Sequence, residues 1–219
     1  MKLRSLAVFT IVNAIACGSS HPPVTMTTHD AAEYPFVLLD PKAVTHDFMV
    51  RQNLKIHAVV KGEAHDGEFD AVLQKQADAM IIIGFGPMNV KAFTLEQHGD
   101  QIKFQQYMGP QLPFSPRNVV VDVQRVFFKH LPPPKSDGGD ATKFSGQVHG
   151  ELDGETLDET WTEGQLRTIV ATRPAMKGAI RIELGPGCTD ARCEPENATL
   201  RNEWFDYTLR IANEDFQPL

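Results

Sequence analysis

The sequence predicts a mainly β protein in which an antiparallel sheet is covered by a helix. Three runs with strand-like composition follow one another, separated by glycine-containing turns, and they span residues 79–85, 88–97 and 101–107. Directly after them, Ser115 and Pro116 have the residue types of a helix N-cap and first helical position. A meander that leads at once into an apolar helix indicates a concave surface with a cover.

The N-terminus has the pattern of an export signal over residues 1–16. Lys2 and Arg4 supply the positive start, and the apolar run of residues 6–16 is too short to span a membrane. The run ends in Ala14-Ile15-Ala16-Cys17, which resembles the bacterial lipobox, where the cysteine is diacylated and becomes the new N-terminus. The alternative is an ordinary cleaved signal with an incidental cysteine.

A lipid on Cys17 implies a membrane anchor, because two or more acyl chains on one residue make attachment long-lived. Gly18 and Ser19 are not the Asp-type residues associated with inner-membrane retention, so the resemblance implies the outer membrane of a Gram-negative bacterium, with the protein facing the periplasm. Residues 17–33 contain Pro22, Pro23 and a threonine run without hydrophobic period. They predict a flexible tether ahead of one domain, residues 34–219.

The charge of the chain argues against nucleic acid as a partner. The formal net charge is −7 among 219 residues, and it becomes about −9 once Lys2 and Arg4 leave with the signal. Because neutralisation of phosphates by Lys and Arg supplies most affinity for nucleic acid, an acidic chain without a basic stripe is a poor binder.

The segments before the meander predict one hairpin. Residues 34–39 are apolar and predict either an edge strand or the lead-in to a brief helix near residues 42–48. Residues 51–61 alternate as a strand, which places Leu54, Ile56, Ala58 and Val60 on one face. A turn over residues 62–67 and a second strand over residues 68–76 complete the hairpin.

The helix after Ser115 has an apolar face at helical period, formed by Val119, Val120, Val123 and Phe127. The opposite side carries Arg117, Asp122, Arg125 and Lys129, which predicts a solvated polar face. β-Branched residues are weak helix formers, so tertiary packing is expected to stabilise this helix. The prolines from Pro132 onward end it.

The C-terminal half predicts five more strands, at residues 144–152, 155–161, 165–172, 179–184 and 205–211. Residues 185–198 are expected to form a loop that contains Cys188 and Cys193. In an exported protein this pair predicts a disulfide, and a zinc site is disfavoured because neither another cysteine pair nor a nearby histidine completes four ligands.

No constellation of residues indicates catalysis, a metal or a cofactor, so the sequence predicts a protein that is not an enzyme. The neighbouring pairs His29-Asp30, His46-Asp47 and His65-Asp66 point their side chains apart in regular structure. The carboxylates at Asp153/Glu155 and Asp158/Glu159 lie in a polar hairpin, where solvation is expected.

With these elements in order, the chain resembles an uncharacterised family of bacterial lipoproteins related to the LolA/LolB lipoprotein carriers. The similar stretches are Ile81-Ile82-Ile83-Gly84-Phe85-Gly86-Pro87-Met88 with Phe93-Thr94-Leu95, then Gln111-Leu112-Pro113-Phe114, Ile180/Ile182 and Tyr207/Leu209/Ile211. The resemblance implies an open, curved antiparallel half-barrel of about ten or eleven strands, covered by one or more helices, whose apolar concave face holds acyl chains.

Carried over to this sequence, the resemblance places Phe93, Leu95, Ile102 and Phe104 in the wall of a cavity and Val119, Val120, Val123 and Phe127 in its cover. It implies a non-catalytic lipoprotein that binds or relays a lipid, an acyl chain, a lipoprotein or another amphiphile. The alternative is a structural lipoprotein whose concave face docks an envelope protein, since inward Phe and Leu residues of any sheet have this pattern.

Overall fold

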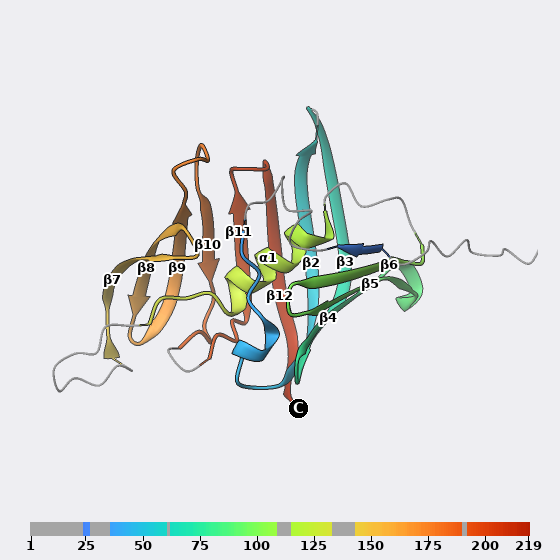
Figure 1. Ribbon diagram of the computed structural model, residues 1–219, viewed down its shortest axis with the longest axis horizontal. Coiled ribbons are helices and arrows are strands. Elements are labelled where there is room, and N and C mark those ends of the chain that lie inside the picture. Colours follow the sequence, from blue (N-terminus) through green and yellow to red (C-terminus); the bar gives the residue numbers. More distant parts are fainter. Residues whose placement is uncertain (1–23, 27–35, 61, 109–114, 133–142, 190–191) are drawn as a thin grey trace, which may run out of the picture.

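The computed structural model describes residues 24–26, 36–60, 62–108, 115–132, 143–189 and 192–219. These residues form one curved, unclosed antiparallel sheet around the α-helix α1, Pro116–Phe127 (Figure 1). The predicted mainly β fold, with a curved antiparallel sheet and a covering helix, is confirmed. Among the described helices, none is long and apolar enough to cross a membrane.

The sheet contains twelve strands. In chain order they are β1 Val24–Met26, β2 Phe48–Val60, β3 Glu63–Gln76, β4 Ala79–Phe85, β5 Lys91–His98, β6 Gln101–Gln106, β7 Gly146–Leu152, β8 Glu155–Thr162, β9 Gln165–Thr172, β10 Ile180–Leu184, β11 Asn197–Asn202 and β12 Tyr207–Pro218. Two short 3-10 helices, η2 Pro41–Ala43 and η3 Pro87–Asn89, lie between strands.

Two meanders are joined side by side through the last strand. The strand order is β1-β6-β5-β4-β3-β2-β12-β11-β10-β9-β8-β7, so β12 pairs with β2 and links the halves on either side. Leu209 lies opposite Ile56 in this pairing, and Ile211 lies opposite Leu54. The C-terminal strand therefore places the alternating apolar residues of both halves on one continuous concave face.

The β2–β3 hairpin is longer than the sequence indicates. The predicted turn over residues 62–67 is wrong, because β3 begins at Glu63 and pairs with β2 as far as Val60. Gly62 lies in the tight turn between them, with φ of 85°. Residues 63–68 are mostly polar and exposed, so the backbone ladder rather than hydrophobic alternation holds them in the strand.

Other boundaries also differ from the sequence prediction. The expected helix near residues 42–48 is only η2, and the strand expected from residue 88 begins at Lys91, after η3. β11 occupies the end of the predicted 185–198 loop, and β12 continues to Pro218 beyond a bulge. In the segment predicted as a tether, Val24–Met26 pairs with β6, while residues 17–23 and 27–33 lie outside the described residues.

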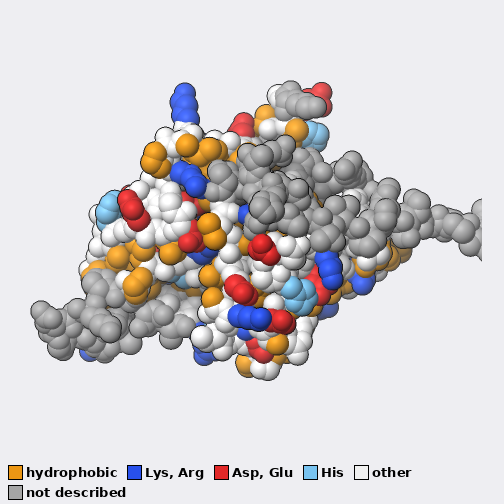
Figure 2. Space-filling view, viewed as in Figure 1, with side chains coloured by type: hydrophobic (Ala, Val, Ile, Leu, Met, Phe, Trp, Pro, Cys, Tyr) orange, Lys and Arg blue, Asp and Glu red, His pale blue; other side chains and the backbone are white. Residues whose placement is uncertain are grey.

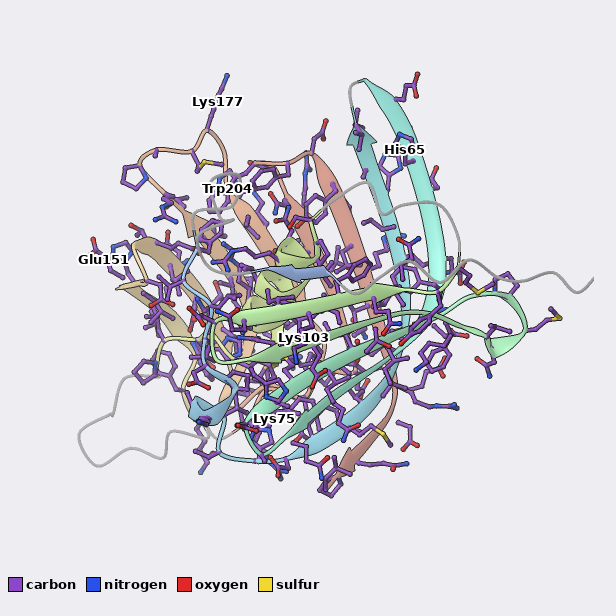
Figure 3. All side chains as sticks on the ribbon, turned by 45° about the vertical axis from the view of Figure 1, so that its right-hand side comes forward. His65, Lys75, Lys103, Glu151, Lys177 and Trp204 are labelled. Atoms are coloured by element: carbon purple, nitrogen blue, oxygen red, sulfur yellow. A yellow bond between two sulfur atoms is a disulfide. The ribbon has the colours of Figure 1, made fainter. Side chains whose placement is uncertain are left out.

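Helix α1 begins as predicted, with the Ser115 side chain accepting a hydrogen bond from the Arg117 backbone N–H. The prediction of a solvated polar face is wrong, because Arg117, Asp122 and Arg125 are all buried. Figures 1 and 3 show the reason: α1 crosses inside the curve of the sheet, and the segment of residues 36–40 passes over its outer side. The helix is therefore surrounded rather than laid on a surface.

Candidate functional site

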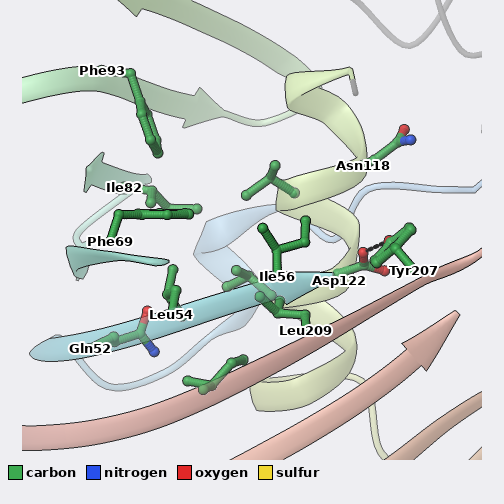
Figure 4. Close-up of a pocket in the computed structure, with 13 residues that line it drawn as sticks. Gln52, Leu54, Ile56, Phe69, Ile82, Phe93, Asn118, Asp122, Tyr207 and Leu209 are labelled. Carbon is green, nitrogen blue, oxygen red and sulfur yellow. Dashed lines mark hydrogen bonds between the residues drawn. The ribbon is translucent and has the colours of Figure 1, made fainter. Parts of the chain in front are cut away.

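A cavity lies between the first turns of α1 and the concave face of the sheet, and we call it the helix-start cavity (Figure 4). Its volume is about 60 Å³. Most of its lining side chains are apolar. The lining residues are Gln52, Leu54, Ile56, Phe69, Ile82, Phe93, Asn118, Val119, Asp122, Val123, Tyr207, Leu209 and Ile211.

Burial distinguishes the floor of the helix-start cavity from its mouth. Leu54, Ile82 and Ile211 are buried and form the floor. Ile56 and Leu209, which face each other across β2 and β12, are only half-buried. The cavity therefore opens toward the outer end of the β2–β12 pair, beside the N-terminal turn of α1.

Phe93 covers a glycine in the wall of this cavity. Its ring lies over Gly84 on β4, where any side chain would collide with it. The ring also meets Phe69 edge-on, with centroids 5.9 Å apart. Gly84 thus allows an aromatic side chain to lie flat against the sheet.

The structure separates the predicted cavity residues into two groups. Phe93, Val119 and Val123 line the helix-start cavity. The others are buried in the core and are not among its lining residues; they are Leu95, Ile102, Phe104, Val120 and Phe127. Alternation and helical period identify the inward side chains, but they do not reveal which of these leave space between them.

The polar lining residues were missed by sequence reasoning. The Tyr207 hydroxyl donates a hydrogen bond to Asp122 and accepts one from Asn202 Nδ2 at 3.0 Å. Gln52 Nε2 donates to Asn213 at 2.8 Å. The alternation of β12 did place Tyr207 on the inward face, but its pairing with a helix carboxylate depends on the tertiary structure.

A buried ion-pair network fastens the last turn of α1 to the sheet. Arg125 contacts Glu155 of β8, with 2.7 Å between Nη2 and Oε1, and Asp122 of its own helix, with 3.1 Å between Nη1 and Oδ1. Its guanidinium also lies 4.0 Å from the centroid of the Phe36 ring. The predicted solvated position of Glu155 is wrong, because its side chain points beneath the helix.

Glu159 is a second carboxylate whose predicted solvated position is wrong. It is fully buried, at 0% exposure, and it accepts hydrogen bonds from the Leu131 backbone N–H at 2.8 Å and from Trp161 Nε1 at 3.2 Å. Burial outweighs these hydrogen bonds and raises the pKa of Glu159 to about 7. This carboxyl group joins the chain leaving α1 to strand β8.

The segment of residues 36–40 is held across the outer side of α1 by side chains of the helix. Gln124 donates to the Leu39 carbonyl at 2.9 Å and accepts from the Leu39 N–H at 2.8 Å. Arg117 donates to the Phe36 carbonyl. Lys129, just beyond the helix, donates to the Val37 carbonyl at 2.6 Å. These contacts satisfy the backbone of a segment that has no strand partner.

Cys188 and Cys193 form a disulfide, whereas Cys17 lies outside the described residues. Within the described parts of the chain, no group of three or more His, Cys, Asp or Glu side chains could hold a metal ion. Several histidines pair with carboxylates on the outer face of the sheet, as His57 does with Asp66 at 2.7 Å. Such exposed pairs are ordinary surface contacts.

The visible surface mixes acidic, basic and hydrophobic side chains (Figure 2). Met88 in η3 is 92% exposed, and Val90 and Met108 are exposed as well. The Met108 sulfur lies against Gly86. Exposed apolar side chains therefore occur at the β4–β5 connection, at Met88 and Val90, and at Met108 after β6.

Comparison with known families gives one match: the family described as "Protein of unknown function (DUF3261)" matches residues 49–215. A search of curated proteins found no match.

The solved structures similar to this chain include the following three. A LolA superfamily protein from Nitrosomonas europaea has 8% identity and a TM-score of 0.41, with 80% of this chain and 86% of that chain covered. A putative outer membrane lipoprotein-sorting protein domain from Vibrio parahaemolyticus has 11% identity and a TM-score of 0.37, covering 79% and 85%. A DUF1329 family protein from Desulfovibrio piger has 10% identity and a TM-score of 0.34, covering 82% and 94%.

The predicted resemblance is confirmed in these terms: the chain matches a family of unknown function, and a LolA superfamily protein is among the structures similar to it. All three TM-scores are below 0.5, so the chemistry of this chain has to be inferred from its own cavities and contacts.

Proposed function

This chain belongs to DUF3261, a family of proteins of unknown function, and we propose that it is a lipid-anchored envelope protein that holds the apolar chain of an amphiphile in the helix-start cavity. The single observation that carries the proposal is an apolar cavity with half-buried Ile56, Phe69 and Leu209 at its mouth. Binding of this kind requires no covalent chemistry.

The energetics favour an apolar chain as guest. Each methylene group that leaves water contributes about 0.8 kcal/mol, so even a short part of an acyl chain gains from entering this lining. The lining also includes two polar side chains, Asn118 and Tyr207, and the Tyr207 hydroxyl is hydrogen-bonded to Asp122 and Asn202. The lining is thus mainly apolar, which suits the apolar chain of an amphiphile.

The size of the helix-start cavity sets a condition on this function. Its volume of about 60 Å³ is well below the roughly 300 Å³ at which typical ligand pockets begin. A longer guest therefore requires the first turns of α1 to move outward. Those turns contact the cavity through Val119 and Val123, whereas the Arg125–Glu155 ion pair lies further along the helix. Moving the start of α1 leaves the Arg125–Glu155 ion pair in place, although it gives up the hydrogen bond from Arg117 to the Phe36 carbonyl.

The proposed location depends on Cys17. We infer that Cys17 carries the lipid, that residues 17–33 connect it to the domain, and that the domain faces the periplasm from the outer membrane. Export with Cys17→Ser should release the protein from washed membranes into the soluble periplasmic fraction and abolish its labelling by radioactive palmitate. A Cys17→Ser protein that stays membrane-bound after export would contradict the anchor and leave the cavity unaffected.

The guest is tested with the purified domain. Native mass spectrometry and solvent extraction should find a co-purified lipid-like molecule, and a dansylated fatty acid should bind with increased fluorescence. Ile56→Trp, which fills the mouth from a half-buried position, should reduce that binding at least tenfold. Ile83→Trp on β4 is the matched control, because Ile83 is half-buried on the opposite face of the sheet. A consistently empty domain that ignores the probe would refute the proposal and favour the docking alternative.

A further inference from the structure

A second cavity lies at the other end of α1, and we call it the helix-end cavity. Its volume is about 340 Å³. None of its lining residues lines the helix-start cavity. They are Leu39, Ala43, Val44, Thr45, His46, Phe127, Phe128, His130, Leu131, Pro132, Trp161, Thr189, Arg192 and Cys193. Figure 1 shows the chain leaving α1 toward β7 on the same side as η2, which precedes Val44.

His130 is the unusual side chain of this cavity. Both ring nitrogens are buried, and neither makes a hydrogen bond of normal geometry to a described residue. Burial lowers the pKa of His130 to about 4, although the nearby Phe127 carbonyl favours the protonated form. The ring is therefore neutral at physiological pH, with one N–H donor and one acceptor nitrogen. Buried polar groups without partners are costly, so a ligand that satisfies His130 gains affinity.

The walls around His130 are firmly held. The Leu131 backbone and the Trp161 indole, which both line the cavity, donate to the buried Glu159 carboxyl group. The disulfide between Cys188 and Cys193 closes the loop on the opposite side. A cavity with fixed walls costs little to organise when a ligand binds.

The charges at the cavity favour an uncharged ligand. Arg192 is the lining residue with a permanent charge, and Glu194 offsets it at 3.3 Å. Burial lowers the pKa of His46, with opposing influences from Glu194, Arg192, Lys75 and Asp47 around it. No net charge is thus presented to a guest, while Phe127, Phe128 and Trp161 present aromatic surface.

From this geometry we propose that the helix-end cavity binds a compact, uncharged molecule with an aromatic or alicyclic body and a hydroxyl group, which pairs with His130 once its imidazole ring turns a buried nitrogen toward the cavity. The volume of about 340 Å³ is in the range of small-molecule pockets, and it exceeds the roughly 150 Å³ of a cavity that holds benzene. A two-ring alcohol therefore fits. A hydroxyl group both donates and accepts, as the neutral imidazole does.

The test compares 2-naphthol with naphthalene, which has the same rings and lacks the hydroxyl group. The chain contains two tryptophans, so a ¹H–¹⁵N spectrum shows two indole signals. Trp161 lines the helix-end cavity, and Trp204 does not. Lys75 marks the region of the cavity, because it contacts Asp47, the neighbour of the lining residue His46. Trp204 and Lys75 lie toward opposite ends of the view in Figure 3. 2-Naphthol should shift the Trp161 signal, leave that of Trp204 in place, and bind at least tenfold more tightly than naphthalene.

Variants test whether His130 is the residue that recognises the hydroxyl group of the ligand. His130→Phe should reduce the affinity for 2-naphthol to that for naphthalene, whereas His149→Phe, an exposed histidine paired with Asp158, should leave it unchanged. Equal affinities of the two compounds for the unaltered protein would overturn the proposal even if His130→Phe does not fold. An unmoved Trp161 signal, or displacement of a dansylated fatty acid by 2-naphthol, would overturn it as well.

Discussion

The two ends of helix α1 differ in how they meet the rest of the protein. At its start, α1 contacts β2, β3 and β12 through apolar side chains around a small cavity with a half-buried mouth. At its end, the chain is fixed by a buried carboxyl group, a disulfide-closed loop and the crossing segment of residues 36–40. The contacts around the helix-start cavity are mainly non-directional, with the Arg117–Phe36 and Tyr207–Asp122 hydrogen bonds as exceptions, whereas those at the other end are mainly directional.

This difference indicates which end can adapt to a guest. Apolar contacts can slide or separate gradually, whereas a buried hydrogen bond or ion pair is lost as a unit when its geometry fails. The start of α1 is thus suited to admit chains of variable length, and the end is suited to recognise one polar group at a fixed place. Substitutions that remove these contacts one at a time test the difference between the two ends of α1.

The largest effect is expected at Arg125, in the last turn of α1. Arg125→Met leaves the carboxylates of Asp122 and Glu155 buried without their partner, so the free energy of unfolding should fall by about 3–5 kcal/mol in urea denaturation. Arg181→Met is the control, because its contact with Glu203 is exposed and should change stability by less than about 1 kcal/mol. Equal losses in the two variants would show that the network does not fasten α1.

The next effect concerns pH at the end of α1. The pKa of Glu159 is raised from 4.5 to about 7, so the folded protein keeps a proton that the unfolded chain releases. This contribution to stability is complete below about pH 4.5 and is lost as the pH rises through 7. Glu159→Gln cannot ionise, and it should gain about 3 kcal/mol relative to the unaltered protein between pH 4.5 and about pH 8.

The titration of His130 changes the stability of the fold with pH in the opposite direction to that of Glu159. Its pKa is lowered from 6.5 to about 4, so its contribution to stability is lost as the pH falls from 6.5 through 4. Glu159→Gln and His130→Phe should therefore tilt the stability profile in opposite directions between pH 4.5 and 6.5, measured by urea denaturation across that range. Parallel profiles in the two variants would mean that neither group has the burial described above.

A smaller effect is expected from the disulfide. Replacing Cys188 and Cys193 together with serine opens a short loop, which costs about 2 kcal/mol in the chain-entropy model. Binding of 2-naphthol should weaken, because the loop forms a wall of the helix-end cavity, while a dansylated fatty acid should bind as before. An equal loss of affinity for 2-naphthol and for the dansylated fatty acid would contradict the proposed difference between the two ends of α1.

The smallest effect is expected at the N-cap. Ser115→Ala removes the hydrogen bond from the Arg117 N–H to Ser115 Oγ and should cost about 1 kcal/mol. Hydrogen exchange should accelerate in the first turn of α1 and stay unchanged near Phe127. Uniform acceleration along α1 would show that its two ends open together.

The strands and the helix were largely predictable because each carries a local pattern. Leu54 and Ile56 alternate with polar residues, and Ser115-Pro116 marks the start of α1. β11 was not predictable in this way, because Ala198 and Leu200 have too short an alternation to stand out from a loop. β11 is a strand because it pairs with β10 on one side and with β12 on the other, and its local sequence does not indicate these partners.

The candidate sites were predictable only in part. Phe93, Val119 and Val123 follow from the inward faces of β5 and α1, but Tyr207 joins them only because β12 pairs with β2, and Asn118 and Gln52 because α1 packs against the concave face. The buried positions of Arg125, Glu155 and Glu159 contradict the simple rule that charged residues face water. Each is paired or hydrogen-bonded to a group distant in sequence, which no local pattern reveals.

The mainly β class, the inward faces of most strands, the start of α1 and the cysteine pair follow from local sequence, because these features depend on neighbouring residues and on periods of two or of about 3.6. The burial of the polar side chains of α1 in a network, and the cavities at both of its ends, follow from the tertiary arrangement. Space and pairing between distant segments depend on how far the sheet curves. That curvature depends on all the strands together, and the sequence of no single strand determines it.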